Sequence, residues 1–144
     1  METLMKRALD IAHLFDVPRG EMACEPYGTG NINDTFCLTV RPWTGAARRY
    51  ILQRVNRYVF PDPEPMMGNI QRVTHYLRGV IAREGGDPAR ETLTLVRAMD
   101  GRPWITDASG DLWRVYLFIE GTVSTDMPDS PEMFAAAGEA FGRF

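Results

Sequence analysis

The sequence predicts an α+β fold in which an antiparallel sheet of about five strands packs with an N-terminal helix and one long helix. Short runs rich in β-branched and aromatic residues are separated by glycine and proline turn signals. Three of these runs follow one another without a helix between them, which favours an antiparallel meander. Two other segments repeat apolar residues at helical spacing, which predicts helices.

The N-terminal part of the chain is predicted to form one helix and three strands. Residues 1–15 carry apolar side chains at helical spacing, and the breaker Asp-Val-Pro-Arg-Gly at 16–20 ends this helix. Strand candidates lie at 22–27 and 35–40 on either side of a glycine turn, and a third lies at 49–55. The helix is expected to cover one side of the sheet.

The rest of the chain is predicted to form a long helix, further strands and a last helix. Prolines between 61 and 65 cannot continue a central strand, but Pro65 suits the first turn of a helix. That helix is predicted over 66–83, and Gly85-Gly86 ends it. Further strand candidates lie at 93–99, 103–106 and 112–119, and the cap Ser130-Pro131-Glu132 opens a helix whose apolar side ends at Phe144.

Composition excludes several classes of function. The formal net charge is −3, so the chain lacks the basic footprint of a nucleic-acid-binding protein. No apolar run approaches the ~20 residues that span a bilayer, and the first residues lack the order of a signal peptide. A cytoplasmic protein with neither nucleic acid nor membrane as a partner is therefore expected.

The two cysteines are too few for a disulfide scaffold, and neither belongs to a metal-spaced pair. If the hairpin is symmetric about Gly30-Asn31, Cys24 and Cys37 face each other across neighbouring strands. In a reducing cytosol, both are expected to be buried thiols.

The turn Tyr-Gly-Thr-Gly-Asn at 27–31 is the first chemical signal. Such a turn between strands can fold over a nucleotide and present backbone N–H groups to its phosphates. Glycine alone also serves ordinary hairpin geometry, because it tolerates positive φ. The context favours a nucleotide site, since the third strand carries Gln53 in an apolar run and the long helix carries Asn69 near its start. This order of turn, strand and helix is that of a kinase-like small lobe.

Six segments extend the pattern over most of the chain. The first, at 25–36, reads Glu-Pro-Tyr-Gly-Thr-Gly-Asn-Ile-Asn-Asp-Thr-Phe, and the others follow at 49–56, 59–62, 67–74, 113–124 and 137–144. On these segments the sequence resembles the N-terminal lobe of the aminoglycoside phosphotransferase and choline kinase superfamily, and within it the sugar kinases that act on N-acetylhexosamines. The resemblance implies a nucleotide-binding small lobe at 1–119. It further implies a hinge and the beginning of a large lobe at 120–144.

The resemblance also implies a role for each matching position in the phosphate-binding loop. Residues 28–35 would cover the phosphates, and Asn31, Asn33 and Thr35 would add donors near the β- and γ-phosphates. Residues 118–121 would form the hinge that offers backbone groups to the adenine edge.

Two positions depart from the pattern that the resemblance implies. Gln53 stands where the family usually has a lysine or arginine, and Asn69 stands where its helix usually has a glutamate. The two amides are expected to hydrogen-bond each other in place of the ion pair, with Arg54 or bound Mg²⁺ compensating for the lost cation. The nucleotide site implied by the resemblance therefore consists of Gly28, Thr29, Gly30, Asn31, Asn33, Thr35, Gln53, Asn69, Phe118, Ile119 and Glu120.

ATP and Mg²⁺ are the implied cofactors, and a sugar is the implied acceptor. Phosphoryl transfer needs an aspartate that orients the acceptor hydroxyl and oxygen ligands for Mg²⁺, supplied by a His-x-Asp…Asn loop and a second aspartate turn. Neither motif occurs here, because His13 and His75 have no aspartate two residues on. The chain is therefore expected to be an inactive fragment that self-associates through exposed apolar surface. Its metal ligands and sugar pocket are expected in a missing large lobe.

Two alternatives stay open at this point. A kinase of the same superfamily that acts on aminoglycosides, choline or homoserine would share these motifs. A non-catalytic α+β binding module would need a finished C-terminus, and the uncapped apolar side at Phe144 argues against it. A sulfatase is disfavoured, because Cys24-Glu25-Pro26 is followed by Gly28 where a formylglycine site needs arginine.

Overall fold

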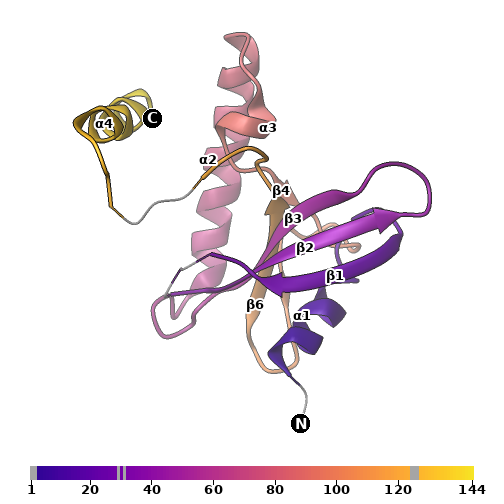
Figure 1. Ribbon diagram of the computed structural model, residues 1–144. Coiled ribbons are helices and arrows are strands. Elements are labelled where there is room, and N and C mark those ends of the chain that lie inside the picture. Colours follow the sequence, from indigo (N-terminus) through magenta and orange to yellow (C-terminus); the bar gives the residue numbers. More distant parts are fainter. Residues whose placement is uncertain (1–2, 29, 31, 124–126) are drawn as a thin grey trace.

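The computed structural model describes residues 3–28, 30, 32–123 and 127–144. Within these residues, six strands form one antiparallel sheet in the order β1-β2-β3-β6-β4, and β5 pairs with β6 beside this path (Figure 1). The predicted α+β class with an antiparallel sheet, an N-terminal helix and one long helix is confirmed. The strands are β1 (Gly20–Pro26), β2 (Asp34–Pro42), β3 (Arg48–Arg54), β4 (Leu95–Val96), β5 (Ile105–Thr106) and β6 (Leu112–Leu117). The helices are α1 (Leu4–Ala12), α2 (Pro63–Arg83), α3 (Pro88–Glu91) and α4 (Pro131–Arg143).

The later strands are shorter than the sequence predicts. β4 and β5 contain two residues each, against the predicted 93–99 and 103–106, and β6 ends at Leu117 rather than 119. The chain after β4 pairs instead with the segment that follows α1 in the sequence, where Ala98 forms a bridge with Phe15. A neighbour distant in sequence thus takes the hydrogen bonds that the local pattern assigned to β4.

α1 covers one face of the sheet (Figure 1). The Thr3 hydroxyl caps the helix by accepting a hydrogen bond from the amide of Lys6 at 3.1 Å. Ala8 and Ala12 are fully buried, and Phe15 packs beside them. The helix thus has the covering role that its apolar spacing predicts. Its partners are the alternate strand residues that point to this side, namely Phe36, Leu38, Val40, Tyr50, Leu52, Trp113 and Val115.

α2 lies on the opposite face of the sheet and begins earlier than the predicted residue 66 (Figure 1). Pro63 and Pro65 both fall in its first turn, where the missing N–H groups would have no intrahelical partner. Among the described side chains of the helix, Met67 alone is buried, and it packs with Val55 and Leu112. The other residues of α2 are half-buried or exposed, and the sheet face on which the helix lies is called the open face below.

The two cysteines do not face each other. The register pairs Cys24 with Leu38 and Glu25 with Cys37, so the predicted symmetric register is wrong by one residue. A shift of one residue moves each side chain to the other face, and Cys24 therefore lies on the α1 side while Cys37 lies on the opposite side. Both are free thiols; Cys37 is buried and Cys24 is half-buried. Burial, with a smaller contribution from Cys37, raises the pKa of Cys24 to about 11.

A cluster of charged side chains ties α1 to the ends of β2, β3 and β6. Arg7 donates to Asp107 Oδ2 at 2.5 Å and to Asp111 Oδ2 at 3.1 Å. Arg54 donates to Asp34 Oδ2 at 2.6 Å and lies 3.5 Å from Asp111 Oδ2. The cluster therefore holds the end of β3 in place from the α1 side.

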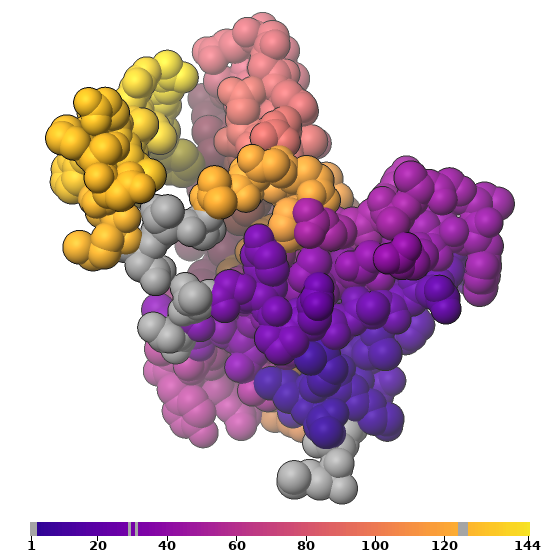
Figure 2. Space-filling model, in the orientation of Figure 1, coloured from indigo at the N-terminus to yellow at the C-terminus, as the bar shows by residue number. Residues whose placement is uncertain are grey.

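α4 stands out at the edge of the molecule, beside the C-terminal part of α2 (Figure 2). The Ser130 hydroxyl caps it by accepting a hydrogen bond from the amide of Met133 at 3.1 Å. Phe134, Phe141 and Phe144 are 69%, 83% and 81% exposed, and a cleft of about 630 Å³ lies between α4 and α2. None of the helices in the described ranges is long and apolar enough to cross a membrane.

Candidate functional site

Three polar side chains form a row on the face of the sheet opposite α1. Thr35 of β2 pairs with Gln53 of β3, and Gln53 pairs in turn with Arg114 of β6. Directly paired residues of antiparallel strands point to the same face, so the three side chains are neighbours. The row lies at the end of the strands that carries the glycine turn, because Thr35 follows that turn in the sequence.

Gln53 is the centre of this row. Its amide nitrogen donates to Thr35 Oγ1 at 3.0 Å. Its amide oxygen accepts two hydrogen bonds from Arg114, from Nε at 2.9 Å and from Nη2 at 2.7 Å. Both ends of the Gln53 amide are thus engaged within the sheet. The structure brings together Thr35 and Gln53, as the predicted site requires, and adds an arginine that the sequence analysis did not select.

Asn69 does not join the row, and the expected hydrogen bond between Gln53 and Asn69 is not formed. The Asn69 side chain is exposed and accepts a hydrogen bond from Arg72 of its own helix. The α2 residue that reaches the row is Met67, whose Sδ lies 3.6 Å from Arg114 Nη1. Two residues along an α-helix differ by about 200° in direction. Because Met67 points to the sheet, Asn69 points away from it.

Arg54 is not available as a replacement cation on this face. Neighbouring residues of a strand point to opposite sides, so Arg54 lies on the α1 side, away from Gln53. There its guanidinium is engaged by Asp34 and Asp111 in the charged cluster. The expectation that Arg54 compensates for the missing cation is therefore wrong.

The glycine turn is joined to the segment that follows β3. Gly28 has a φ of 77°, a left-handed conformation that favours glycine. Asn33 Oδ1 accepts a hydrogen bond from the amide of Asn56 at 2.9 Å, and Asn56 Nδ2 donates to the carbonyl of Ile32 at 3.0 Å. Asn33 thus anchors the turn through its oxygen, while its NH₂ group remains a donor. Thr29 and Asn31 lie outside the described residues, and a Cβ at Gly30 would meet open space.

A less polar row lies next to the first, toward the hinge. Cys37 pairs with Ile51, and Ile51 pairs with Tyr116, so all three side chains point to the open face. Cys37 and Ile51 are only 2% and 7% exposed. Tyr27 and Phe118 approach each other over this side of the sheet, with ring centroids 5.3 Å apart and planes at 71°. Cys37, Ile51 and the half-buried Tyr116 thus form a largely buried apolar layer, with the rings of Tyr27 and Phe118 beside it.

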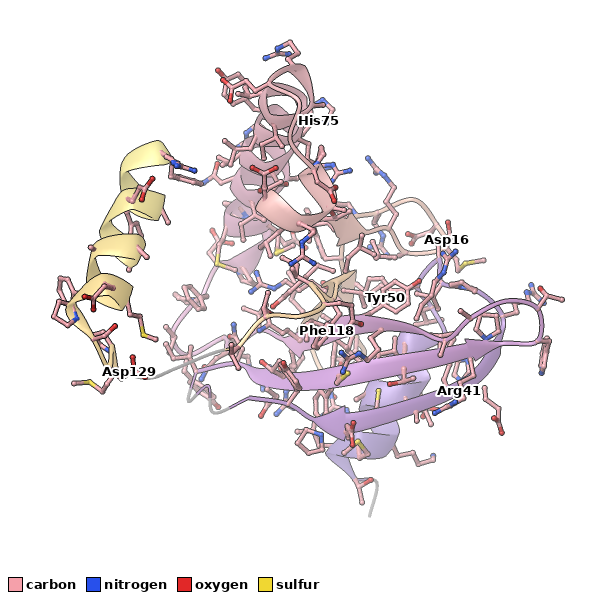
Figure 3. All side chains as sticks on the ribbon, turned by 45° about the horizontal axis from the view of Figure 1, so that its top comes forward. Asp16, Arg41, Tyr50, His75, Phe118 and Asp129 are labelled. Carbon is pink, nitrogen blue, oxygen red and sulfur yellow. The ribbon has the colours of Figure 1, made fainter. Side chains whose placement is uncertain are left out.

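The predicted hinge leaves β6 at Phe118 (Figure 3). Arg49 lies over the Phe118 ring at 4.0 Å and binds both carboxylate oxygens of Glu120. These hydrogen bonds lower the pKa of the Glu120 carboxyl. The carbonyl of Glu120 accepts a hydrogen bond from Arg90 at 2.8 Å. The segment is thus held by arginines of β3 and α3.

Part of the hinge backbone can still form hydrogen bonds. The carbonyl of Ile119 accepts a hydrogen bond from the Thr122 hydroxyl at 3.0 Å, and the amide of Phe118 donates to the carbonyl of Arg49 at 3.3 Å. In the ranges that the structure describes, the amides of Ile119 and Gly121 have no such partner. Among the described residues, these two backbone amides of the hinge segment are therefore still able to donate.

The sequence analysis missed two residues of the site, Arg114 and Asn56. Arg114 belongs to the strand-like run 112–119, in which every second side chain points to one face. That alternation identifies the residues that share a face with Arg114, but only the register of β6 against β3 places it beside Gln53. Asn56 falls in the segment 49–56 that carries the resemblance, but nothing local predicts its contact with the turn.

In the part of the chain that the structure describes, no three His, Cys, Asp or Glu side chains are grouped so that they could hold a metal ion. His13 is the C-cap residue of α1, on the other side of the sheet, and His75 is an exposed residue of α2, about 12 Å along that helix from Met67. No protein-family model matches the chain.

Proposed function

We propose that this chain is the nucleotide-binding lobe of an ATP- and Mg²⁺-dependent kinase that phosphorylates a hydroxyl group of a sugar. The observation that carries the proposal is the order of groups on the open sheet face. A glycine turn and a row of polar donors lie at one end, and an apolar surface bordered by a hinge lies at the other. Phosphates and adenine require these two environments side by side.

The residues of each part fit the corresponding part of ATP. The half-buried Tyr116 would contact the base beside the buried Cys37 and Ile51, and the amides of Ile119 and Gly121 would donate to its edge. The backbone of the glycine turn and the Thr35 hydroxyl would donate to the phosphates. This chain would bind and orient the nucleotide and exclude water from one side of it.

The transfer step is proposed to use groups outside the two rows. It needs an aspartate for the acceptor hydroxyl and oxygen ligands for Mg²⁺, which neutralises charge on the phosphates when bound. We propose that residues 120–144 lead to a large lobe that supplies these groups and the sugar pocket. The exposed phenylalanines of α4 support this, because apolar surface of this kind usually contacts another structure. The preference for an N-acetylhexosamine rests on the resemblance alone, and the use of ATP favours a cytoplasmic location.

The proposal is tested by titrating the ¹⁵N-labelled chain with Mg·ATP and recording amide chemical shifts. Saturable shifts are expected in the glycine turn, at Gln53 and in the hinge at 118–121. At about 10 mM ATP, a ligand with a Kd of ~1 mM occupies about nine tenths of the sites. The absence of saturable shifts under these conditions, or shifts confined to other surfaces, would contradict the proposal.

Two glycine variants provide a matched pair for this titration. Gly28 and Gly45 both have positive φ, 77° and 103°, and a Cβ meets no atom within 4 Å at either. Valine at such a φ is strained by about 1–3 kcal/mol, so each variant distorts its own turn. Gly28→Val is expected to weaken ATP binding by about tenfold or more. Gly45→Val, in the loop between β2 and β3, should leave ATP binding unchanged.

A further inference from the structure

Arg114 is a half-buried cation surrounded by neutral groups. Its Nε and Nη2 donate to Gln53 Oε1 at 2.9 and 2.7 Å, and its Nη1 lies 3.6 Å from Met67 Sδ. Among the described residues, no carboxylate lies within ion-pair distance of its guanidinium. Arg7 and Arg54, on the other face of the sheet, each have two carboxylate partners.

The charge of Arg114 is therefore uncompensated where it lies. Burial lowers the pKa of the Arg114 guanidinium, and the nearby Tyr116 only partly offsets this effect. Arginine nonetheless stays protonated at neutral pH. A charged group that has lost hydration without gaining a counter-charge is unfavourable. An anion that binds here would supply the missing charge.

The hydrogen bonds within the row determine which of its N–H and O–H groups are left without a partner. A guanidinium has five N–H groups, and the contacts to Gln53 and Met67 occupy three of them. The remaining two, one on each Nη, have no partner among the described residues. Thr35 Oγ1 accepts from Gln53, so its own O–H is left to donate. The row thus offers donors from two strands on the open face, beside the glycine turn.

We propose that Arg114 is the cation that binds the phosphates of the nucleotide in this lobe, and that Gln53 is the residue that positions it. This inference rests on the proposed function, because it assigns a charge to the phosphate end of the same site. Gln53 of β3 carries no charge, and the cation of the row is Arg114 on the neighbouring strand β6, about 4.8 Å away. The planar guanidinium fork matches phosphate oxygens in pairs.

The test compares Arg114→Gln with Arg78→Gln in the complete chain. Arg78 is also half-buried and also contacts neutral groups, the carbonyl of Pro88 and the hydroxyl of Thr94. It lies about 16 Å along α2 from Met67, at 1.5 Å per residue, so it serves as a control for the loss of charge. Binding of ATP, adenosine and inorganic tripolyphosphate is measured by calorimetry or by chemical shift titration.

Arg114→Gln is expected to weaken ATP and tripolyphosphate binding by about 10- to 100-fold, and to leave adenosine binding within about twofold. Arg114→Lys should retain part of the lost affinity, because it keeps the charge without the fork. Gln53→Leu should weaken tripolyphosphate binding less than Arg114→Gln does. Arg78→Gln should bind all three ligands like the unmodified chain. In the unmodified chain, tripolyphosphate should shift the Nε–H resonance of Arg114, and this measurement does not depend on any variant that fails to fold.

The outcomes separate this inference from the proposed function. If the chain binds ATP and Gly28→Val abolishes binding while Arg114→Gln does not weaken it, the role of Arg114 is refuted and the nucleotide site stands. An Arg114 Nε–H resonance that stays unchanged at saturating tripolyphosphate has the same meaning. If tripolyphosphate binds through Arg114 but ATP shows no contact with the hinge, the anion site stands and the kinase proposal fails.

Discussion

Replacing Asp107 provides a quantitative test of how much its hydrogen bonds stabilise the end of the sheet next to α1. The carboxylate lies in the turn before β6 and accepts four hydrogen bonds. Oδ1 accepts from the amides of Ser109 and Asp111 at 2.9 and 3.0 Å. Oδ2 accepts from Arg7 Nη2 at 2.5 Å and from Trp113 Nε1 at 2.8 Å. Replacement by asparagine preserves the shape but converts one of these two acceptor atoms into a donor.

The structure sets the size of the expected effect. If the amide oxygen of the introduced side chain keeps the two backbone contacts, its NH₂ group faces two donors, the Trp113 indole and the Arg7 guanidinium. Trp113 is fully buried, so its unpaired N–H costs about 1–3 kcal/mol. Arg7 is partly exposed and keeps its contact with Asp111 at 3.1 Å, so the loss of its contact with Asp107 costs about 1 kcal/mol. Asp107→Asn should therefore lower the free energy of unfolding by about 2–4 kcal/mol at pH 7.

The effect should depend on pH. Burial by itself raises the pKa of the Asp107 carboxyl, but the hydrogen bonds from Trp113, Asp111, Arg7 and Ser109 outweigh it, and the pKa is lowered overall. A carboxyl whose folded pKa is depressed stabilises the protein above its unfolded pKa of about 3.9. That contribution is lost as the pH falls through the folded pKa. The difference between the unmodified chain and Asp107→Asn should therefore shrink below about pH 4.

The assay is urea unfolding followed by tryptophan fluorescence at pH 7 and at acidic pH. With an m-value of about 2 kcal/mol/M, the midpoint at pH 7 should fall by about 1–2 M. Asp100→Asn is the matched control, because Asp100 also lies in a turn and binds an arginine, Arg102, but is exposed. Its midpoint should scarcely change. A midpoint for Asp107→Asn within about 0.3 M of the unmodified chain at pH 7, or a difference that grows toward low pH, would refute this account of the turn.

Three further predictions concern the core and the thiols. Leu38→Ala removes a fully buried side chain and should lower the free energy of unfolding in urea by about 2–5 kcal/mol. Val73→Ala, on the exposed side of α2, should change it by less than about 0.5 kcal/mol. Equal effects of the two variants would contradict the assigned core. Because the pKa of Cys24 is raised to about 11, its alkylation by iodoacetamide should speed up about tenfold per pH unit between about pH 8 and 10, and a plateau near pH 9 would contradict this. Mild oxidation should not join Cys24 to Cys37, since they lie on opposite faces, and mass spectrometry without reductant would detect such a bridge.

Local patterns were sufficient to predict most of the fold. The apolar spacing of 1–15 and 66–83 predicts the two helices that cover the sheet, and the turn signals separate the strands. The errors concern the ends of strands and the register of the hairpin between β1 and β2. β4 stops at Val96 because the chain beyond it pairs with the segment after α1, and the hairpin register differs by one residue from symmetry. Both depend on partners that the local sequence does not specify.

Of the residues predicted for the candidate site, Thr35 and Gln53 on adjacent strands are neighbours in the structure, whereas Asn69 on α2 does not join them. Thr35 and Gln53 do meet on the open face. The position of Asn69 near the start of the helix predicts a place in the site, but the rotation of α2 turns Met67 to the sheet instead. The contact between Arg114 and Gln53 depends on β3 and β6 being neighbours in the sheet, which local patterns do not specify.

The sequence by itself determined the class of fold, the place of the glycine turn and the residues that alternate on each strand, because these depend on backbone preferences and apolar spacing over a few neighbouring residues. The tertiary structure decided which of those residues meet. It placed Arg54 among carboxylates behind the sheet and Arg114 among neutral groups in front of it, although both are arginines on adjacent strands. The reason is that strand register fixes which of the two charges meets carboxylates, and among the described residues the charge of Arg114 meets none.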